Sequence, residues 1–353
     1  MNPFSPFTIG RFTLRNRLAV APMTRMSSPG GSIPRRDVLE FLIRRARHGA
    51  ALVYTEGIVT DEAGAQGYPR QARLLTPAQI DAWRPVVRAI QEAGAVAIAQ
   101  IFHCGRVAWP EVNPARRTIA PSALAPTRIN RFTGRPYPVP EAMTQADMDQ
   151  VIQGFVESAR GAMAAGFDGV ELHGAHCYLI SEFLSAHTNQ RTDAYGGSPE
   201  RRYRFVHELI QAVRRVVPGD RLLTFRISNW SAADPGVSLF SSRDEWQGII
   251  RWLSQEGLDA ISLSTLNFAE PAFGTTYTVA QLTRQATPLP LFLCGGIYDR
   301  ATAEAALASA DVVLSAKSML LNPAWVEDVL AGKPLRSYTQ EEAGVAYTET
   351  PLP

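Results

Sequence analysis

The chain has 353 residues, of which 46% are hydrophobic and 19% charged, and 35 Lys and Arg against 33 Asp and Glu leave a formal net charge of +2. So small a cationic surplus gives no reason to expect a nucleic acid or an anionic membrane surface as partner. The three cysteines, Cys104, Cys177 and Cys294, lie far apart without a Cys-x-x-Cys motif, which argues against a zinc knuckle, a cysteine-ligated iron–sulfur cluster and a disulfide framework.

Eight short apolar runs rich in Val, Ile and Leu alternate along the chain with longer segments of helical periodicity. These predicted strands occupy residues 17–22, 50–55, 95–102, 167–172, 221–227, 258–263, 289–294 and 310–316. None of them alternates cleanly between apolar and polar positions, which is typical of parallel strands covered on both faces.

Five helices with recognisable ends are predicted between these strands. They span residues 76–94, 144–166, 198–219, 242–257 and 299–310. The first begins with Thr76 as N-cap before a proline and ends at Gly94. The densest basic run, RRDVLEFLIRRARH at 35–48, is interpreted as a solvated helix face.

Eight strand-then-helix units over this length predict a (β/α)8 TIM barrel, with residues 1–353 as a single domain. No Gly-x-Gly-x-x-Gly opens a helix after the first strand, which counts against a dinucleotide-binding open sheet. Residues 103–143 are Pro-rich and almost without helical pattern, so we expect a long βα loop on the C-terminal face of the barrel, where active sites are built. Residues 336–353 are expected to form a surface arm.

In such a barrel the residues at the strand ends face one common pocket. In chain order the predicted lining comprises Pro22, Met23, Thr24, Arg25, Glu56, Gly57, Gln100, His103, His173, His176, Tyr178, Arg226, Gly295, Gly296 and Lys317. Gly295, Gly296 and Lys317 follow the seventh and eighth strands, where this fold commonly holds a phosphate. An ordinary turn and a surface lysine explain these three residues equally well.

Arg226 lies in the apolar segment TFRIS, where burial of an unpaired guanidinium is costly. It therefore needs an anionic or strongly accepting partner. A barrel carboxylate such as Glu171 is one candidate. A cofactor that gains negative charge, such as a reduced isoalloxazine at its N1/O2 edge, is the other.

The segment HGAHCYLISEFLS, residues 173–185, gathers two histidines, a cysteine and a tyrosine. A zinc site at His173 and His176 would need a third ligand, and the other four histidines are scattered. Cys177 as a nucleophile would point away from its neighbours. Two interpretations remain: core histidines satisfied by backbone carbonyls, or a clamp in which both histidines donate to one carbonyl oxygen and Tyr178 is a proton donor beside it.

From about residue 4 to about residue 335 the chain resembles the old yellow enzyme family of FMN-dependent ene-reductases. The resemblance is carried by NRLAVAPMTR (16–25), YTEG (54–57), QIFHCGR (100–106), AGFDGVELHGAHCYLISEFLSAHTNQRTDAYGGSPERRYRF (165–205), CGGI (294–297) and DVVLSAKSMLLNPAW (311–325). It implies non-covalently bound FMN, NAD(P)H as reductant and a small activated alkene as substrate. No metal is implied.

The resemblance also implies a role for each residue of the site. Around the flavin ring it places Pro22, Met23, Thr24, Gly57 and Gln100. At the phosphate it places Gly295, Gly296, Ala316 and Lys317. Thr24 would tune the flavin from near its C4 oxygen, and Arg226 would meet the N1/O2 edge. His173 and His176 would bind the substrate carbonyl, flavin N5 would deliver a hydride to the β-carbon, and Tyr178 would protonate the α-carbon.

Three positions depart from the family's pattern. Ala316-Lys317 stands where Gly-Arg is usual, and because lysine lacks a two-pronged donor geometry we expect weaker phosphate binding. Cys177 stands where glycine is usual, and a Cβ there can narrow the pocket or shift Tyr178. Thr24 matches one branch of the family, whereas QIFHCGR and HGAH match another branch, which often has Cys at position 24.

Two other functions stay open on the sequence. One is a flavin oxidoreductase whose oxidant is a quinone, a nitro compound or a nitrate ester, and the other is a flavin-binding barrel with little turnover. The natural substrate, the preference between NADH and NADPH and the subunit number, a homo-oligomer included, are not specified. With no apolar run of eighteen residues and no N-terminal secretion signal, the expected location is the cytoplasm.

Overall fold

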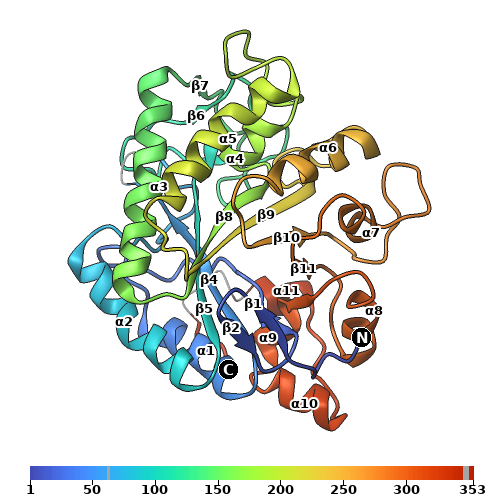
Figure 1. The fold of residues 1–353 in the computed structure, drawn as a ribbon. Coiled ribbons are helices and arrows are strands. Elements are labelled where there is room, and N and C mark those ends of the chain that lie inside the picture. The colour runs from blue at the N-terminus through green and yellow to red at the C-terminus, as the bar shows by residue number, and fades with distance from the viewer. Residues whose placement is uncertain (62–63, 345–349) are drawn as a thin grey trace.

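The structure is a computed structural model that describes residues 1–61, 64–344 and 350–353. Eight parallel strands close into a barrel in the order β10-β11-β12-β3-β4-β5-β8-β9, and helices surround it (Figure 1). The barrel strands are β3 (Leu18–Val20), β4 (Leu52–Val59), β5 (Val96–Phe102), β8 (Gly169–His176), β9 (Leu222–Ser231), β10 (Ala260–Ser264), β11 (Leu291–Cys294) and β12 (Val312–Ser315). Each of the eight predicted strands overlaps one of these, so the predicted (β/α)8 barrel is confirmed.

The five predicted helices are present, each ending before the last residue predicted for it. They are α2 (Pro77–Glu92), α3 (Gln145–Ala165), α5 (Pro199–Arg214), α6 (Arg243–Leu253) and α8 (Arg300–Ala306). Thr76 and Thr144 form capping boxes at the starts of α2 and α3, and Gly166 ends α3 in the left-handed region at φ 93°. The other helices are α1 (Arg36–Arg47), α4 (Leu179–Leu184), α7 (Val279–Arg284), α9 (Lys317–Leu321), α10 (Trp325–Ala331) and α11 (Gln340–Gly344).

The basic helix α1 differs from the solvated face that was predicted. Its Arg45 is 2% exposed and donates to the carbonyl oxygens of Met319 and Leu320 in α9, at 2.7 and 3.2 Å. The guanidinium also lies over the ring of Phe41, 3.5 Å from its centroid, and donates to the carbonyl of Pro353. One arginine of the run therefore ties α1 to α9 and to the C-terminal residue, because the backbone carbonyls satisfy its buried N–H groups.

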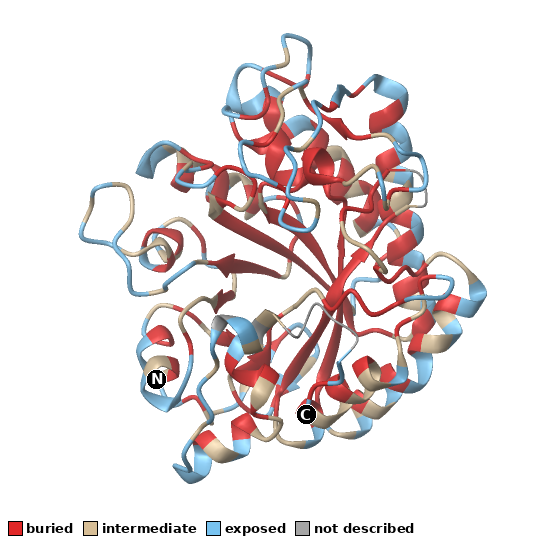
Figure 2. Ribbon diagram, turned by 180° about the vertical axis from the view of Figure 1, so that it is seen from behind, coloured by how far each residue is buried: buried red, intermediate tan, exposed pale blue. Residues whose placement is uncertain are grey.

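An antiparallel hairpin that was not predicted closes the N-terminal end of the barrel. Its strands are β1 (Phe7–Ile9) and β2 (Phe12–Leu14), joined by a turn with Gly10 at φ 52°. Ile9 and Leu14 pack in one cluster with residues at the starts of the barrel strands, among them Leu52 and Val96. The hairpin plugs that end, so the barrel opens at the C-terminal ends of its strands. Figure 2 shows the buried residues concentrated in the strands and on the inner faces of the helices.

The long loop 103–143 is largely irregular. It contains a 3-10 turn (Gly105–Val107) and a two-residue parallel pair, β6 (Ile119–Ala120) with β7 (Glu141–Ala142). At the end of the predicted surface arm Leu352 is buried, whereas residues 345–349 of that arm lie outside the described residues. Within the described chain, no helix combines the length and apolar character needed to cross a membrane.

Candidate active site

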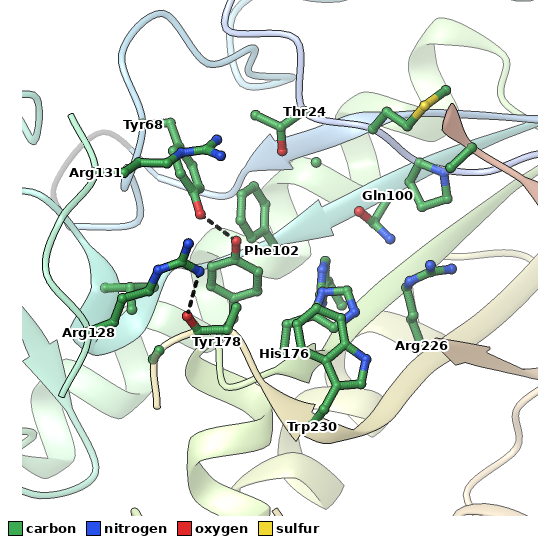
Figure 3. Close-up of a pocket in the computed structure, with 18 of the residues that line it drawn as sticks. Thr24, Tyr68, Gln100, Phe102, Arg128, Arg131, His176, Tyr178, Arg226 and Trp230 are labelled. Atoms are coloured by element: carbon green, nitrogen blue, oxygen red, sulfur yellow. Dashed lines mark hydrogen bonds between the residues drawn. The ribbon is translucent and has the colours of Figure 1, made fainter. Parts of the chain in front are cut away.

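A cavity of about 450 Å³ opens at the C-terminal ends of the barrel strands (Figure 3). The predicted residues that line it are Pro22, Met23, Thr24, Gly57, Gln100, His173, His176, Tyr178, Arg226, Ala316 and Lys317. Its volume lies within the usual range for cofactor and ligand sites. Residues from six segments of the chain that lie far apart in sequence are thus brought to one place.

Five residues predicted to line the pocket do not line it in the described structure. Gly295 and Gly296 lie in the turn after β11, at φ 129° and 74°. Arg25, Glu56 and His103 are buried outside the lining. The Arg25 backbone N–H donates to Glu56 at 3.1 Å, and burial raises the pKa of Glu56 to about 7. Glu56 and His103 each stand next to a residue that lines the cavity, Gly57 and Phe102, and neighbouring residues of an extended chain face opposite ways, so these two side chains lie in the layer around it.

Strand β8 continues through His176, so the two histidines lie on the strand rather than beyond it. His173 pairs with Arg226 in register, and the register then shifts before His176 pairs with Ser231. At Gly174 a Cβ would lie 2.3 Å from the ring of Phe225, so glycine is required where the strand passes that ring. His176 and Cys177 then take left-handed φ values of 62° and 65° as the chain turns toward α4.

The two histidines are uncharged at neutral pH. Burial, with a further contribution from the charge of Arg226, lowers the pKa of His173 to about 3. Burial also lowers the pKa of His176 well below its ordinary value. Nδ1 of His173 accepts the Ala175 backbone N–H at 3.3 Å, so the proton of this neutral ring is on Nε2 and can be donated.

Ser264, at the end of β10, connects His176 to Arg226. Its Oγ accepts from Arg226 Nη2 at 3.1 Å and lies 2.7 Å from Nε2 of His176. Because a guanidinium only donates, Ser264 Oγ accepts from Arg226, and its own proton is available to His176 Nε2; in the tautomer that accepts it, the imidazole proton is on Nδ1. Trp230 packs against the His176 ring with centroids 4.3 Å apart, and its indole N–H donates to the Ser264 carbonyl at 3.0 Å. The orientation of His176 is therefore fixed on two sides.

Arg226 faces both the cavity and the carboxylate that was considered as its partner. Its Nη1 lies 4.0 Å from Glu171 Oε1 and donates to Ser262 at 3.2 Å. Glu171 in turn accepts from Gln100 at 2.8 Å and from Thr224 at 3.2 Å. The Glu171 carboxylate thus balances the buried charge from one side, and Arg226 still lines the cavity on the other.

The hydroxyl of Tyr178 does not stand alone. It lies 2.7 Å from the hydroxyl of Tyr68, which comes from the connection after β4 (Figure 3). The Tyr178 ring packs edge-on against Phe102 and His173, with centroids 5.2 and 5.0 Å apart. Tyr68 was not recognised from the sequence, because it lies nine positions beyond the end of β4 (Leu52–Val59) and carries no motif of its own.

Cys177 does not narrow the cavity, so the first of the two effects expected of it was wrong, and a shift of Tyr178 stays a prediction. The residue is fully buried and is not part of the described lining. Its Sγ accepts from Arg106 Nη2 at 3.1 Å and lies 3.9 Å from Asp234, which itself pairs with Arg106. Burial raises the pKa of the thiol, which also makes it a poor nucleophile.

The donors around the cavity fit FMN. Arg226 on β9 and Lys317 after β12 place two cations at separate positions of the cavity. FMN needs both, because its ring gains negative charge on reduction and its phosphate is anionic. Gln100 and Thr24 supply an amide and a hydroxyl to the lining. At Gly57 a Cβ would lie 2.7 Å from the Phe102 ring, so no side chain can project there. Among the described residues no three His, Cys, Asp or Glu side chains converge as a metal site.

Comparison with known proteins agrees with this arrangement. Residues 3–336 match the NADH:flavin oxidoreductase / NADH oxidase family. The chain is 32% identical over 372 residues to putative 12-oxophytodienoate reductase 4 of Oryza sativa subsp. japonica, covering 99% of this chain and 92% of that protein. It is 31% identical over 368 residues to a probable flavin mononucleotide-dependent alkene reductase of Leishmania infantum, covering 98% and 96%.

A solved structure is similar over nearly the whole chain. The old yellow enzyme homologue of Zymomonas mobilis superposes with a TM-score of 0.87 at 28% identity, covering 99% of this chain and 98% of that one. Fold, sequence and the chemistry of the cavity thus agree. The chain belongs to the NADH:flavin oxidoreductase / NADH oxidase family and is an FMN-dependent oxidoreductase of the old yellow enzyme type.

Proposed function

We propose that this protein reduces C=C bonds conjugated to a carbonyl group, with NAD(P)H as the source of hydride. The observation that carries the proposal is the convergence of His173, His176 and Tyr178 on one cavity. The ring centroid of His173 lies 5.0 Å from that of His176 and 5.0 Å from that of Tyr178. The names of the similar proteins, a 12-oxophytodienoate reductase and an alkene reductase, support the same chemistry.

In this proposal the two histidines bind the carbonyl oxygen of the substrate. Nε2–H of His173 and Nδ1–H of His176 are the donors, and both rings are neutral, so they stabilise negative charge as it develops on the oxygen. The withdrawal of electron density makes the β-carbon electrophilic. Bound FMN, held by the residues named below, would supply the transfer of hydride from NAD(P)H to that carbon. The Tyr178 hydroxyl gives its proton to the α-carbon.

FMN is proposed to contact the protein through its ring, its phosphate and its N1/O2 edge. The ring would lie against Pro22, Met23, Thr24, Gly57 and Gln100, and the phosphate would lie at Gly295, Gly296, Ala316 and Lys317. Thr24 would approach the C4 oxygen, and Arg226 would meet the N1/O2 edge. The contacts of Arg226 to Ser262 and Ser264 fix the orientation of its guanidinium, which would hold that edge.

Tyr68 is proposed to return a proton to Tyr178 after each turnover. Tyr178 is 8% exposed, whereas Tyr68 is only half-buried and lies on the loop side of the cavity. Their hydroxyls are 2.7 Å apart, so a proton can pass between them without rearrangement of either ring.

Tyr68→Phe should slow reoxidation of the flavin by 2-cyclohexenone about 3–10-fold, the effect of losing one hydrogen bond to the proton donor. Reduction by NADPH should keep its rate, because that step needs no proton from Tyr178. Stopped-flow absorbance of the flavin measures both steps in one preparation. Equal slowing of the two steps would point to a general disturbance of the cavity and contradict the relay.

The proposed function is tested by anaerobic mixing. NADPH should bleach the yellow flavin, and 2-cyclohexenone should restore the colour. A flavin that binds and is reduced but is reoxidised by no enone would refute the proposal. Reoxidation by a quinone, a nitro compound or a nitrate ester alone would favour the alternative oxidants.

We also propose that the protein is located in the cytoplasm. Cys104, Cys177 and Cys294 are free thiols, which supports the reducing environment of the cytoplasm. A homo-oligomer is a prediction of the same kind.

A further inference from the structure

A buried acid in the barrel interior contacts two of the residues assigned to the flavin. Glu171 is on β8, two positions before His173, and is fully buried. It is in register with Gln100 on β5 and with Thr224 on β9, so these three residues lie at one level of the barrel. Gln100 and Arg226 reach the cavity lining on the side away from Tyr68 (Figure 3).

Glu171 accepts hydrogen bonds from the strands on both sides of it. Gln100 Nε2 donates to its Oε1 at 2.8 Å, and the Thr224 hydroxyl donates to its Oε2 at 3.2 Å. Arg226 Nη1 lies 4.0 Å from the same Oε1. The amide nitrogen and the guanidinium have protons to donate and no lone pair with which to accept, so Oε1 carries no proton.

Glu171 supplies the negative charge that balances Arg226. Burial raises the pKa of this carboxyl, and the charge of Arg226 opposes that effect. Arg226 is itself only 3% exposed, so a neutral acid in its place would take away the counter-charge of a buried guanidinium. The ion pair stabilises both groups, whereas either charge alone would be costly to bury.

The contact with Glu171 also determines how Gln100 presents its amide. One N–H of the amide is taken by the carboxylate, which leaves the carbonyl oxygen and the second N–H for the cavity. A flavin ring carries an N–H group between two carbonyl oxygens, and an amide that can both accept and donate matches this pattern. The carboxylate therefore acts on the flavin edge through Gln100 as well as through Arg226.

The charge of Glu171 acts on a flavin in the opposite direction to the charge of Arg226. The ring becomes more negative when it is reduced, and a nearby cation favours this change whereas a nearby anion opposes it. Both effects are strong in the barrel interior, because the effective dielectric constant there is low. The pair of charges therefore sets how readily the ring accepts electrons.

We propose that Glu171 is a positioning residue of the flavin site, which orients Gln100 and Arg226 and whose negative charge keeps the reduction potential of bound FMN lower than Arg226 alone would set it. The inference rests on the proposed function, in which Gln100 and Arg226 contact the flavin ring. A lower potential makes the reduced flavin a stronger donor of hydride, which suits transfer to an alkene.

Glu171→Gln removes the charge and keeps the shape of the side chain. The new amide can accept from Gln100 and donate to Thr224, so the dissociation constant of FMN should stay within about threefold of the wild-type value. The protein with FMN is then reduced slowly without oxygen together with the dye phenosafranine, and visible spectra give the equilibrium between them. This equilibrium should move at least tenfold toward reduced flavin, which corresponds to a potential about 30 mV more positive.

Glu256→Gln is the matched control. Glu256 is also buried, and its Oε2 accepts from Gln211 at 3.2 Å and lies 2.7 Å from His207 Nδ1. Both of these partners are on α5, and Glu256 is not part of the described lining of the cavity. The control replaces a buried carboxylate by an amide away from the flavin, so its equilibrium with the dye should stay within twofold of the wild-type value.

The two half-reactions give a signature that damage to the cavity would not produce. In Glu171→Gln, reduction by NADPH should become faster and reoxidation by 2-cyclohexenone slower. A flavin of higher potential gains a hydride more readily and gives it up less readily. Slowing of both steps, with an unchanged dye equilibrium, would show a role in structure alone and overturn the proposal.

An equilibrium that moves toward oxidised flavin in Glu171→Gln would also overturn it. If this variant loses FMN, Glu171→Asp and Glu171→Asn make the same comparison with a shorter side chain. The amide variant should then lie at least tenfold further toward reduced flavin, and equal values in the two would refute the role of the charge. The dye measurement needs no alkene, so its failure is distinct from that of the proposed function, which would appear as a flavin that no enone reoxidises.

Discussion

Replacement of Tyr178 by Phe is expected to slow flavin reoxidation by 2-cyclohexenone about 10²–10⁴-fold, which is the usual contribution of a positioned general acid. The ring should stay in place, because its edge-on contacts with Phe102 and His173 involve carbon atoms and not the hydroxyl. Reduction by NADPH should stay within about threefold of the wild-type rate, since that step transfers hydride alone. Rapid mixing of the reduced protein with the enone under anaerobic conditions measures the effect.

A second tyrosine provides the control. Tyr203 lies on α5 outside the cavity lining, and its ring packs against Trp252 with centroids 4.8 Å apart. Tyr203→Phe should therefore leave both half-reactions unchanged. A wild-type rate of reoxidation in Tyr178→Phe would mean that another group protonates the α-carbon. Tyr68 would then be the candidate, and the Tyr68→Phe/Tyr178→Phe double variant would identify it.

The barrel and most of its pocket were predictable because both follow from periodicity. Continuous apolar runs separated by capped helices define the order of the strands, and the order of the strands brings their ends together. Gln100, His173 and Arg226 could therefore be assigned to one cavity although they are far apart in the sequence, and all three line it. The resemblance to a known family then suggested what each of them binds.

The residues that were missed act through contacts that periodicity does not encode. Ser264 is the last residue of a strand that was predicted to end one position earlier, and its contact with His176 depends on how β8 and β10 sit in the closed barrel. Tyr68 reaches Tyr178 from an irregular connection, whose path is set by packing and not by a repeating pattern. In both cases the sequence contains the residue but no local signal for its partner.

Cys177 and Arg45 were misinterpreted for a related reason. A dense run of basic residues suggested a solvated helix face for Arg45, and the replacement of the family's usual glycine suggested that the Cβ of Cys177 narrows the pocket. Arg45 is instead buried among carbonyl groups of α9, and Cys177 turns toward Arg106 because its left-handed φ of 65° reverses the direction of the chain. The direction of a side chain at a strand end is a property of the backbone conformation, which the sequence alone leaves open.

His173→Ala and His176→Ala should each lower the rate of enone reduction about 10²–10³-fold, the usual loss when one donor to a developing oxyanion is removed. Each should also weaken binding of a phenol such as 4-chlorophenol, whose oxygen takes the place of the substrate carbonyl. Ser264→Ala removes only the hydroxyl that holds His176, so we expect a smaller loss of affinity, about 3–10-fold. Titration of the flavin spectrum with the phenol measures all three variants in one format.

The pH dependence of phenol binding distinguishes neutral histidines from charged ones. The folded-state pKa of His173 is about 3 and that of His176 is well below its ordinary value, so neither ring gains or loses a proton between about pH 5.5 and 8. Wild-type affinity should therefore follow the ionisation of the phenol alone, with no inflection near 6.5. A charged imidazolium donor would instead lose its proton, and the phenol its affinity, as the pH rises through that value. Unchanged affinity in both alanine variants would contradict the clamp itself, because each variant removes one of the two donors to the phenol oxygen.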